Sequence, residues 1–310
     1  MTRTCVLKAS PPHLTNRPSG LCQARPRYIT RRFFSMALVD TRINYFTPPA
    51  DGSKPYQWTT ANHPGGGPMR NWEPLPHDIQ VENIRGQETT PDYKLDTTGF
   101  EFHRIPNKTN INFEDDAEIR EKYYAESIEN IKKLTGASRV VVFDHTLRKP
   151  RPAGTPETPE NRSPVKLAHV DQTHESATRR VHLHLPEADV PALLSKRFQI
   201  INLWRPIANP AWQFPLALCD FRSVQSGDFV PSTLKYLDRD GETLAVKYNP
   251  EHKWKYVAGM TPDEIVLIKC FDSEKGVATF TPHTAIDDPN TPVDAPDRQS
   301  IELRTLVFYD

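Results

Sequence analysis

The sequence predicts a mostly β protein of the α+β type, in which short strands pack as a sandwich or a barrel. Two observations carry this prediction. The second half of the 310-residue chain alternates short β-branched and aromatic runs with turn formers, and 30 prolines are spread along the whole chain. The share of proline is about twice the usual value of roughly 5%. So much proline argues against a helical bundle and favours ordered loops between short strands.

The first 39 residues differ in composition from the rest of the chain. They contain seven Lys or Arg residues and no Asp or Glu. An acid-free, Arg-rich start is typical of a mitochondrial targeting peptide, but Met36 directly precedes a stretch of ordinary domain composition, so a disordered extension stays an open interpretation. We expect residues 40–310 to form a single domain.

The order of elements follows from hydrophobic spacing and from turn residues. Residues 40–110 are rich in Pro, Gly, Asn and Asp and are expected to form an extended arm that wraps the core. A helix is predicted over 115–136, where Ile119, Tyr123, Ile128, Ile131 and Leu134 recur at helical spacing. Further predictions are a strand at 138–146, a loop at 150–165 that can cover a site, a helix at 186–197, and strands at 198–207, 215–220, 242–249, 252–258, 264–272, 276–283 and 300–310.

Composition excludes several kinds of partner. With 39 basic and 39 acidic residues the formal net charge is zero, which gives no basis for binding nucleic acid or an anionic membrane. No stretch approaches the roughly 20 apolar residues that a membrane-spanning helix needs. The expected partner is therefore a small molecule. The four cysteines have no metal-binding spacing, so we expect reduced thiols in the cytoplasm.

The segment "KLAHVDQTHE" contains the first chemical motif. His169 and Asp171 are two positions apart, so on a strand both side chains leave the same face and can bind one cation. The late segment "ATFTPHTAI" supplies His283 as a third ligand. Two histidines and one carboxylate on one face of an octahedron are typical of non-haem Fe(II) oxygenases, although the histidine of an isolated His-x-Asp is most often a hydrogen-bonded surface or core residue.

Cations and a hydroxyl follow the third histidine. Arg298 and Ser300 share one face of a predicted strand, and a guanidinium with a hydroxyl suits the far end of a dicarboxylate cosubstrate. Arg304 has the same strand parity and is the alternative anchor for that carboxylate. Arg205 faces either the pocket, where it would bind an acidic group, or a structural carboxylate.

The roles of four other residues are more open. His182 and His184 alternate as on a strand, and packing explains them better than a second metal. Arg148, with His145 nearby, follows a predicted strand and can line the mouth of a cavity.

The sequence resembles the fungal hydroxylase/desaturase group, whose members act in aspergillic acid and gibberellin biosynthesis and have relatives in bacterial cephamycin methoxylation. The resemblance covers residues 44–310 and rests on "NYFTPPADGSKPY", "VVVFDHTLR", "AHVDQT", "RVHLHLP", "INLWRPI", "PLALCDFRSV", "DEIVLIKCFDS", "TPHTAI" and "RQSIELRTLVFY". This family looks like a branch of the Fe(II)/2-oxoglutarate oxygenases. The resemblance therefore implies a double-stranded β-helix, or distorted jelly roll, flanked by helices in one catalytic domain.

The resemblance also implies the cofactors and the reaction. His169, Asp171 and His283 match the iron triad, and Arg298 and Ser300 match the Arg-x-Ser that holds 2-oxoglutarate. The expected activity uses Fe(II), 2-oxoglutarate and O2 to hydroxylate or desaturate a small secondary metabolite. A non-oxidative isomerase or cyclase, or an accessory binding subunit with the same fold, remains an alternative, and the sequence specifies neither the substrate nor the oligomeric state.

Overall fold

The computed structural model describes residues 37–60, 63–64, 66–106, 111–149 and 162–310. The predictions for the basic segment before residue 37 and for the loop at 150–161 lie outside this part of the chain.

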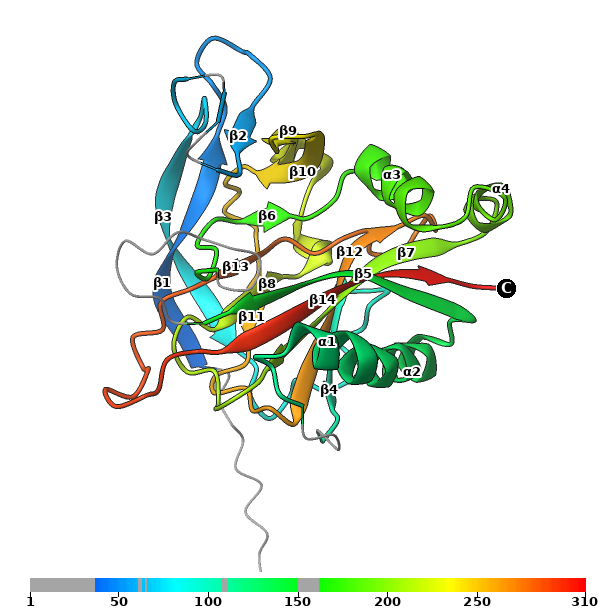
Figure 1. The fold of residues 1–310 in the computed structure, drawn as a ribbon. Helices are drawn as coiled ribbons and strands as arrows, with labels where there is room; N and C mark the ends of the chain where they lie inside the picture. The colour runs from blue at the N-terminus through cyan, green and yellow to red at the C-terminus, as the bar shows by residue number, and fades with distance from the viewer. Residues whose placement is uncertain (1–36, 61–62, 65, 107–110, 150–161) are drawn as a thin grey trace, which may run out of the picture. The chain divides into compact units, whose positions relative to one another are not determined.

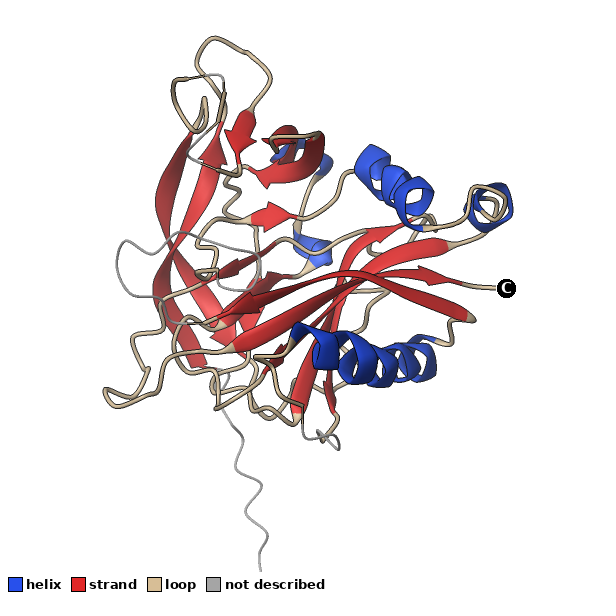
Figure 2. Ribbon diagram, in the orientation of Figure 1, coloured by secondary structure: helices blue, strands red, loops and turns tan. Residues whose placement is uncertain are grey.

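Two β-sheets form the framework (Figures 1 and 2). The nine-stranded sheet has the order β1-β3-β11-β8-β13-β6-β10-β9-β2, and the five-stranded sheet has the order β4-β12-β7-β14-β5. The larger sheet contains β1 (Ala37–Thr47), β2 (Tyr56–Trp58), β3 (Glu73–Asn83), β6 (His169–Val170), β8 (Leu216–Cys219), β9 (Phe229–Lys235), β10 (Asp240–Val246), β11 (Trp254–Tyr256) and β13 (His283–Ala285). The smaller sheet contains β4 (Phe100–Arg104), β5 (Arg139–Arg148), β7 (Phe198–Pro206), β12 (Glu264–Asp272) and β14 (Ser300–Phe308).

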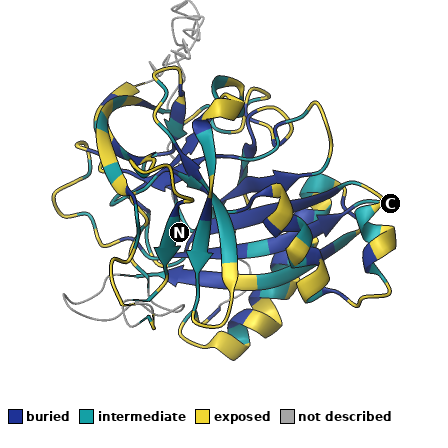
Figure 3. Cartoon of the chain, turned by 90° about the horizontal axis from the view of Figure 1, so that it is seen from above, coloured by how far each residue is buried: buried dark blue, intermediate teal, exposed yellow. Residues whose placement is uncertain are grey.

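Apolar side chains from both sheets meet between them. One core cluster joins Leu218 of β8 to Trp204 of β7 and Val266 of β12, and all three side chains are buried. Nearly every residue of β7, β12 and β14 is buried, and Figure 3 shows buried strands in the interior, with exposed residues on the helices, the loops and parts of other strands. The predicted mostly β fold, a distorted double-stranded β-helix, is confirmed.

The segment expected to be an arm contains a regular strand pair. β1 and β3 are antiparallel over eleven residues each, from Ala37 opposite Asn83 to Thr47 opposite Glu73. Val39 and Ile43 of β1 share a buried cluster with Ala168 and Val170, on the strand that also carries the first metal-binding candidate. The N-terminal part of the described chain therefore supports β6 from the side opposite to His169, since alternate residues of a strand face opposite ways.

The predicted helix at 115–136 is present but has three parts. These are α1 (Asp116–Glu118), a π-helical turn η1 (Ile119–Tyr123) and α2 (Tyr124–Thr135). The Asp115 carboxylate accepts hydrogen bonds from the first turn, and Gly136 ends the helix with a φ of 74°. Its apolar face covers the outer side of the five-stranded sheet.

Three predicted details are wrong. Residues 174–184 form helix α3 (His174–His184), so His182 and His184 do not alternate on a strand face. The reason is local, because Thr173 and Ser176 form a reciprocal cap and Ala177 and Val181 bury one helical face. The strand expected at 276–283 begins only at His283, and the helix expected at 186–197 is limited to α4 (Val190–Leu194). β9 was not predicted, nor were the short 3-10 turns η2 (Phe221–Ser223) and η3 (Ser226–Asp228).

No helix in the described ranges is long and apolar enough to cross a membrane.

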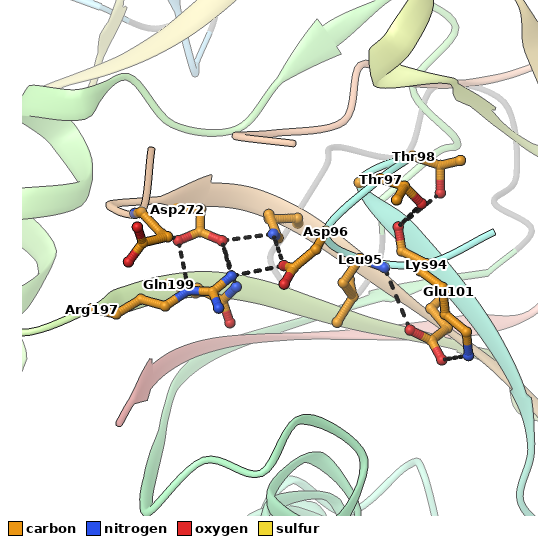
Figure 4. A network of polar contacts seen from close by, with 12 residues as sticks. Lys94, Leu95, Asp96, Thr97, Thr98, Glu101, Arg197, Gln199 and Asp272 are labelled. Atoms are coloured by element: carbon orange, nitrogen blue, oxygen red, sulfur yellow. Dashed lines mark hydrogen bonds and ion pairs between the residues drawn. The ribbon is translucent and has the colours of Figure 1, made fainter. Parts of the chain in front are cut away.

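A buried ion-pair network joins β12 to β7 and to the loop before β4 (Figure 4). The side chains of Lys269 and Asp272 have no exposed area, and their Nζ and Oδ2 atoms lie 2.6 Å apart. Asp272 also accepts hydrogen bonds from Arg197 at 2.7 Å and from Gln199 at 2.6 Å, while Lys269 Nζ donates to Asp96 at 2.8 Å. Because every charge has a partner, burial of these groups is tolerated.

We predict that Lys269→Met lowers the free energy of unfolding by about 3–5 kcal/mol, because it leaves the buried Asp272 carboxylate without its nearest cation. Urea denaturation at neutral pH measures this change. Lys255→Met is the matched control, since Lys255 also lies on a strand and pairs with one carboxylate, that of Glu82. Equal losses in the two variants would contradict a special contribution from the network.

We also predict that this stabilisation disappears in acid. Burial alone would raise the pKa of Asp272, but Arg197 and Lys269 outweigh it and hold the pKa below its usual value. The unfolded chain then binds more protons, so the contribution is complete above the unfolded carboxyl pKa of about 3.9 and is lost as the pH falls through the folded pKa. The difference in unfolding free energy between wild type and Asp272→Asn should therefore shrink between about pH 6 and about pH 3.

Candidate metal and cosubstrate site

Strand pairing brings the three predicted metal ligands together. His169 begins β6 and His283 begins β13, and these two residues are direct partners in the antiparallel ladder. Asp171 follows β6 by one residue. The Nε2 atoms of His169 and His283 lie 3.4 Å and 3.9 Å from Asp171 Oδ1, and one donor atom from each residue lies within 4.8 Å of the others.

Backbone contacts fix the orientation of both imidazoles. His169 Nδ1 is 2.8 Å from the carbonyl oxygen of Leu167, and His283 Nδ1 is 3.0 Å from that of Thr281. A carbonyl oxygen only accepts, so each Nδ1 carries the proton and each Nε2 presents a lone pair. Outer contacts of this kind are typical of histidines that ligate a metal.

The carboxylate of Asp171 is held from the opposite sheet. Its Oδ2 atom accepts hydrogen bonds from Asn202 Nδ2 at 2.9 Å and from Arg304 Nε at 3.2 Å. Oδ1 faces the two imidazoles. One oxygen is therefore bound by the protein and the other is directed to the position that a cation would occupy.

The pKa values of the three triad residues are not all shifted in the same direction. Burial opposes ionisation of Asp171, but Arg304 and the two histidines outweigh it and hold its pKa well below the usual value. For His169, the hydrogen bond and charge of Asp171 outweigh burial and raise the pKa. Burial and the charge of His169 lower the pKa of His283. An ionised carboxylate beside a neutral imidazole matches the donor states that a divalent metal requires.

Arg304 belongs to the site, but its donors are already used. Besides Asp171, its guanidinium contacts Glu302 Oε1 at 2.8 Å, Thr146 Oγ1 at 2.9 Å and Asp144 Oδ2 at 3.2 Å. The alternative prediction that Arg304 anchors a cosubstrate carboxylate is therefore not supported. Its geometry fits a residue that positions Asp171.

Arg298 and Ser300 differ from Arg304, because each has a polar atom without a hydrogen-bond partner. Both side chains are buried, and neither Arg298 Nε nor Ser300 Oγ has a hydrogen-bond partner in the described residues. Arg298 lies over the ring of Trp204 at 5.6 Å and donates one hydrogen bond to the carbonyl of Phe214. Burial and the charge of Arg148 lower the pKa of Arg298 to about 9, so an anion at this place would relieve a real cost.

The structure places Arg205 on the other face of the five-stranded sheet. Along β7, Asn202 and Trp204 face the site, so Arg205 has the opposite parity. It donates to the carbonyl of Ile105 at 2.9 Å and lies over the Tyr123 ring at 5.7 Å. The prediction that Arg205 binds the cosubstrate is corrected by this geometry.

Sequence reasoning missed two residues of the site. Asn202 and Glu302 are buried next to the triad and hydrogen-bond to one another at 3.2 Å. Glu302 lies between Ser300 and Arg304 with the same parity, so the alternation of β14 was a signal that could have identified it. Asn202 sits in an apolar run and gave no comparable signal.

Comparisons with known proteins agree with this geometry. A family model described as an oxidoreductase/YMDC permease-like domain matches residues 43–308. Hydroxylase/desaturase CTB9 of Cercospora beticola is 34% identical over 295 residues, which cover 87% of this chain and 87% of that protein. Hydroxylase/desaturase efuI of Hormonema carpetanum is 34% identical over 297 residues, or 88% of this chain and 95% of that protein. The solved structure of the iron and alpha-ketoglutarate-dependent endoperoxidase NvfI aligns with a TM-score of 0.76 at 27% identity, and covers 88% of this chain and 98% of that chain.

A double-stranded β-helix with two histidines and one carboxylate around a common point defines the class of Fe(II)/2-oxoglutarate-dependent oxygenases. Within that class, the chain belongs to the fungal hydroxylase/desaturase family. The protein is therefore an oxidoreductase, as the resemblance predicted.

We predict that Arg304→Met weakens Fe(II) binding by about 10- to 100-fold, because Asp171 loses a contact that orients it. Anaerobic metal titration measures the change. Arg139→Met is the control, since Arg139 lies on β5 and pairs with Asp189 at 3.0 Å away from the triad. Arg304→Lys keeps the positive charge but lacks the planar guanidinium. It serves as a second variant in case Arg304→Met does not fold. Unchanged affinity in both Arg304 variants would show that Asp171 is held without this residue.

Proposed function

We propose that His169, Asp171 and His283 hold Fe(II), and that Arg298 and Ser300 bind the distal carboxylate of 2-oxoglutarate. The convergence of three donor atoms within 4.8 Å, with both Nδ1 atoms bound to backbone carbonyls, carries the proposal. The unsatisfied Ser300 Oγ and Arg298 Nε support the second part. Together these groups match a cosubstrate with one carboxylate at each end.

The residues of the chain have separate tasks in this proposal. Asn202 and Arg304 fix Asp171 through one oxygen, so that the other remains available. Ser300 and Arg298 orient the cosubstrate, because Ser300 Oγ and Arg298 Nε have no hydrogen-bond partner among the described residues and can bind its far carboxylate. When bound, Fe(II) and 2-oxoglutarate supply an oxidation by O2 that converts the cosubstrate to succinate and CO2.

The substrate we propose is a small secondary metabolite, and the reaction is hydroxylation or desaturation of one of its carbon centres. The relatives support this choice, since two of them are named hydroxylase/desaturases. We further propose that residues 40–310 act as one catalytic domain in the cytoplasm. The buried free thiols of Cys219 and Cys270 fit a reducing compartment.

The proposal predicts that wild-type protein, given Fe(II) and 2-oxoglutarate in air, releases succinate. We expect His169→Ala, Asp171→Ala and His283→Ala each to lose bound iron and to lower succinate formation by about 10³-fold or more, because each removes a metal ligand. Iron content is measured after anaerobic loading, and succinate by chromatography. His182→Ala is the matched control, because this histidine is exposed on α3.

Different outcomes separate the alternatives. Iron binding without succinate release, in the presence of an extract containing candidate metabolites, would favour a non-oxidative isomerase or cyclase. Equal iron content in wild type and all three triad variants would exclude the proposed metal site and favour a metal-free accessory subunit. With a substrate in hand, mass spectrometry distinguishes the gain of an oxygen atom from the loss of two hydrogen atoms.

A further inference from the structure

A second guanidinium faces the place proposed for the cosubstrate. In the ladder between β5 and β14, Arg148 is the direct partner of Ser300 and Thr146 is the direct partner of Glu302. Opposite partners in an antiparallel pair share a face, with Cβ atoms about 4.5–5.5 Å apart. The hydrogen bond from Arg304 to Thr146 shows that this face is the one that holds the triad. Arg148 therefore flanks Ser300 on the β5 side.

Arg298 approaches Ser300 from the other side. Ser300 pairs with Pro206 of β7, next to Trp204, whose ring lies against Arg298. The charge of Arg148 is one of the causes that lower the pKa of Arg298, which places the two guanidinium groups within electrostatic reach of one another. Ser300 is thus bracketed by Arg148, which ends β5, and by Arg298, which lies in the segment just before β14.

The carboxylates of the site do not neutralise these cations. Asp144, Asp171 and Glu302 all form ion pairs with Arg304. Within the described ranges, neither Arg148 nor Arg298 forms an ion pair with any carboxylate. Arg298 is buried and Arg148 is partly buried, so two neighbouring cations at this place cost free energy unless an anion joins them.

The anchoring of Arg148 suits a binding role. One of its NH groups donates to the carbonyl oxygen of Ser163 at 2.6 Å, which fixes the end of the side chain. Burial lowers its pKa, and the charge of Arg304 adds to that effect while Glu302 opposes it. A guanidinium that is fixed through one NH group keeps further donors for a bidentate contact with a carboxylate.

We propose that Arg148 is a second cosubstrate-binding residue, which grips the distal carboxylate of 2-oxoglutarate from the side opposite to Arg298, with Ser300 between them. This inference rests on the proposed function and deepens it. Two cations on one carboxylate make the pocket selective for a 2-oxo acid that carries a second negative charge. A monoanionic 2-oxo acid of the same length, such as 2-oxopentanoate, would leave both cations unpaired.

The experiment measures binding without turnover. Wild type, Arg148→Gln, Arg148→Lys, Arg298→Gln and the double Gln variant are loaded with Fe(II) under nitrogen and titrated with 2-oxoglutarate and with 2-oxopentanoate by calorimetry. We expect Arg148→Gln to raise the Kd for 2-oxoglutarate by about 10- to 100-fold, since hydrogen bonds between charged groups contribute on this scale. The Kd for 2-oxopentanoate should not increase. Arg148→Lys should retain part of the affinity, and the double variant should lose less than the sum of the two single losses, because both residues bind one group.

The controls separate this inference from the proposal beneath it. Arg139→Gln, on the same strand but paired with Asp189, should bind 2-oxoglutarate as wild type does. If wild type itself fails to bind 2-oxoglutarate, the proposed function and this inference both fail. If wild type binds it and Arg148→Gln and Arg148→Lys bind it equally well, only this inference is overturned. An unchanged Kd for 2-oxoglutarate together with a raised KM for the substrate would also overturn it, and would assign Arg148 to an acidic group of the substrate.

Discussion

The site depends on one cross-strand pair. His169 and His283 are separated by more than a hundred residues, and the antiparallel register between β6 and β13 sets them opposite one another. Both strands are very short, with two and three residues, so their own ladder contributes few hydrogen bonds. Their positions are maintained by β8 and β10 on either side, which pair with β13 and β6. The geometry that a metal needs is therefore inherited from neighbouring strands.

Strand β14 contributes to both the core and the site, because its two faces carry different kinds of residue. Ile301 and Leu303 pack against the helix layer, while Ser300, Glu302 and Arg304 face the triad. The period of two that separates structural from chemical residues also explains Arg205, which lies on the packing face of β7. Whether a cationic residue on a strand can bind a ligand therefore depends on the face to which its position directs it, as much as on its charge.

Spacing in the sequence singled out the triad, whose side chains the structure brings together, and it also suggested the Arg298 and Ser300 pair, whose role is a proposal. The mostly β fold and the helix after residue 115 followed from turn residues and from apolar periodicity. The π-helical turn and helix α3 were missed, since the first needs tertiary packing and the second depends on a cap that competes with an apparent strand pattern. Asn202 could not be found, because nothing local distinguishes a buried amide in an apolar run.

The contacts of Asp171 have a mechanical consequence. This proposed ligand directly follows a strand of the nine-stranded sheet, whereas Asn202 and Arg304, which hold it, belong to the five-stranded sheet. Coordination geometry is thereby coupled to the spacing between the two sheets, which Trp204 and Val266 help to set. Interiors are close-packed and transmit small displacements, so enlarging or shrinking a side chain in that core would alter affinity for the ion without touching any ligand.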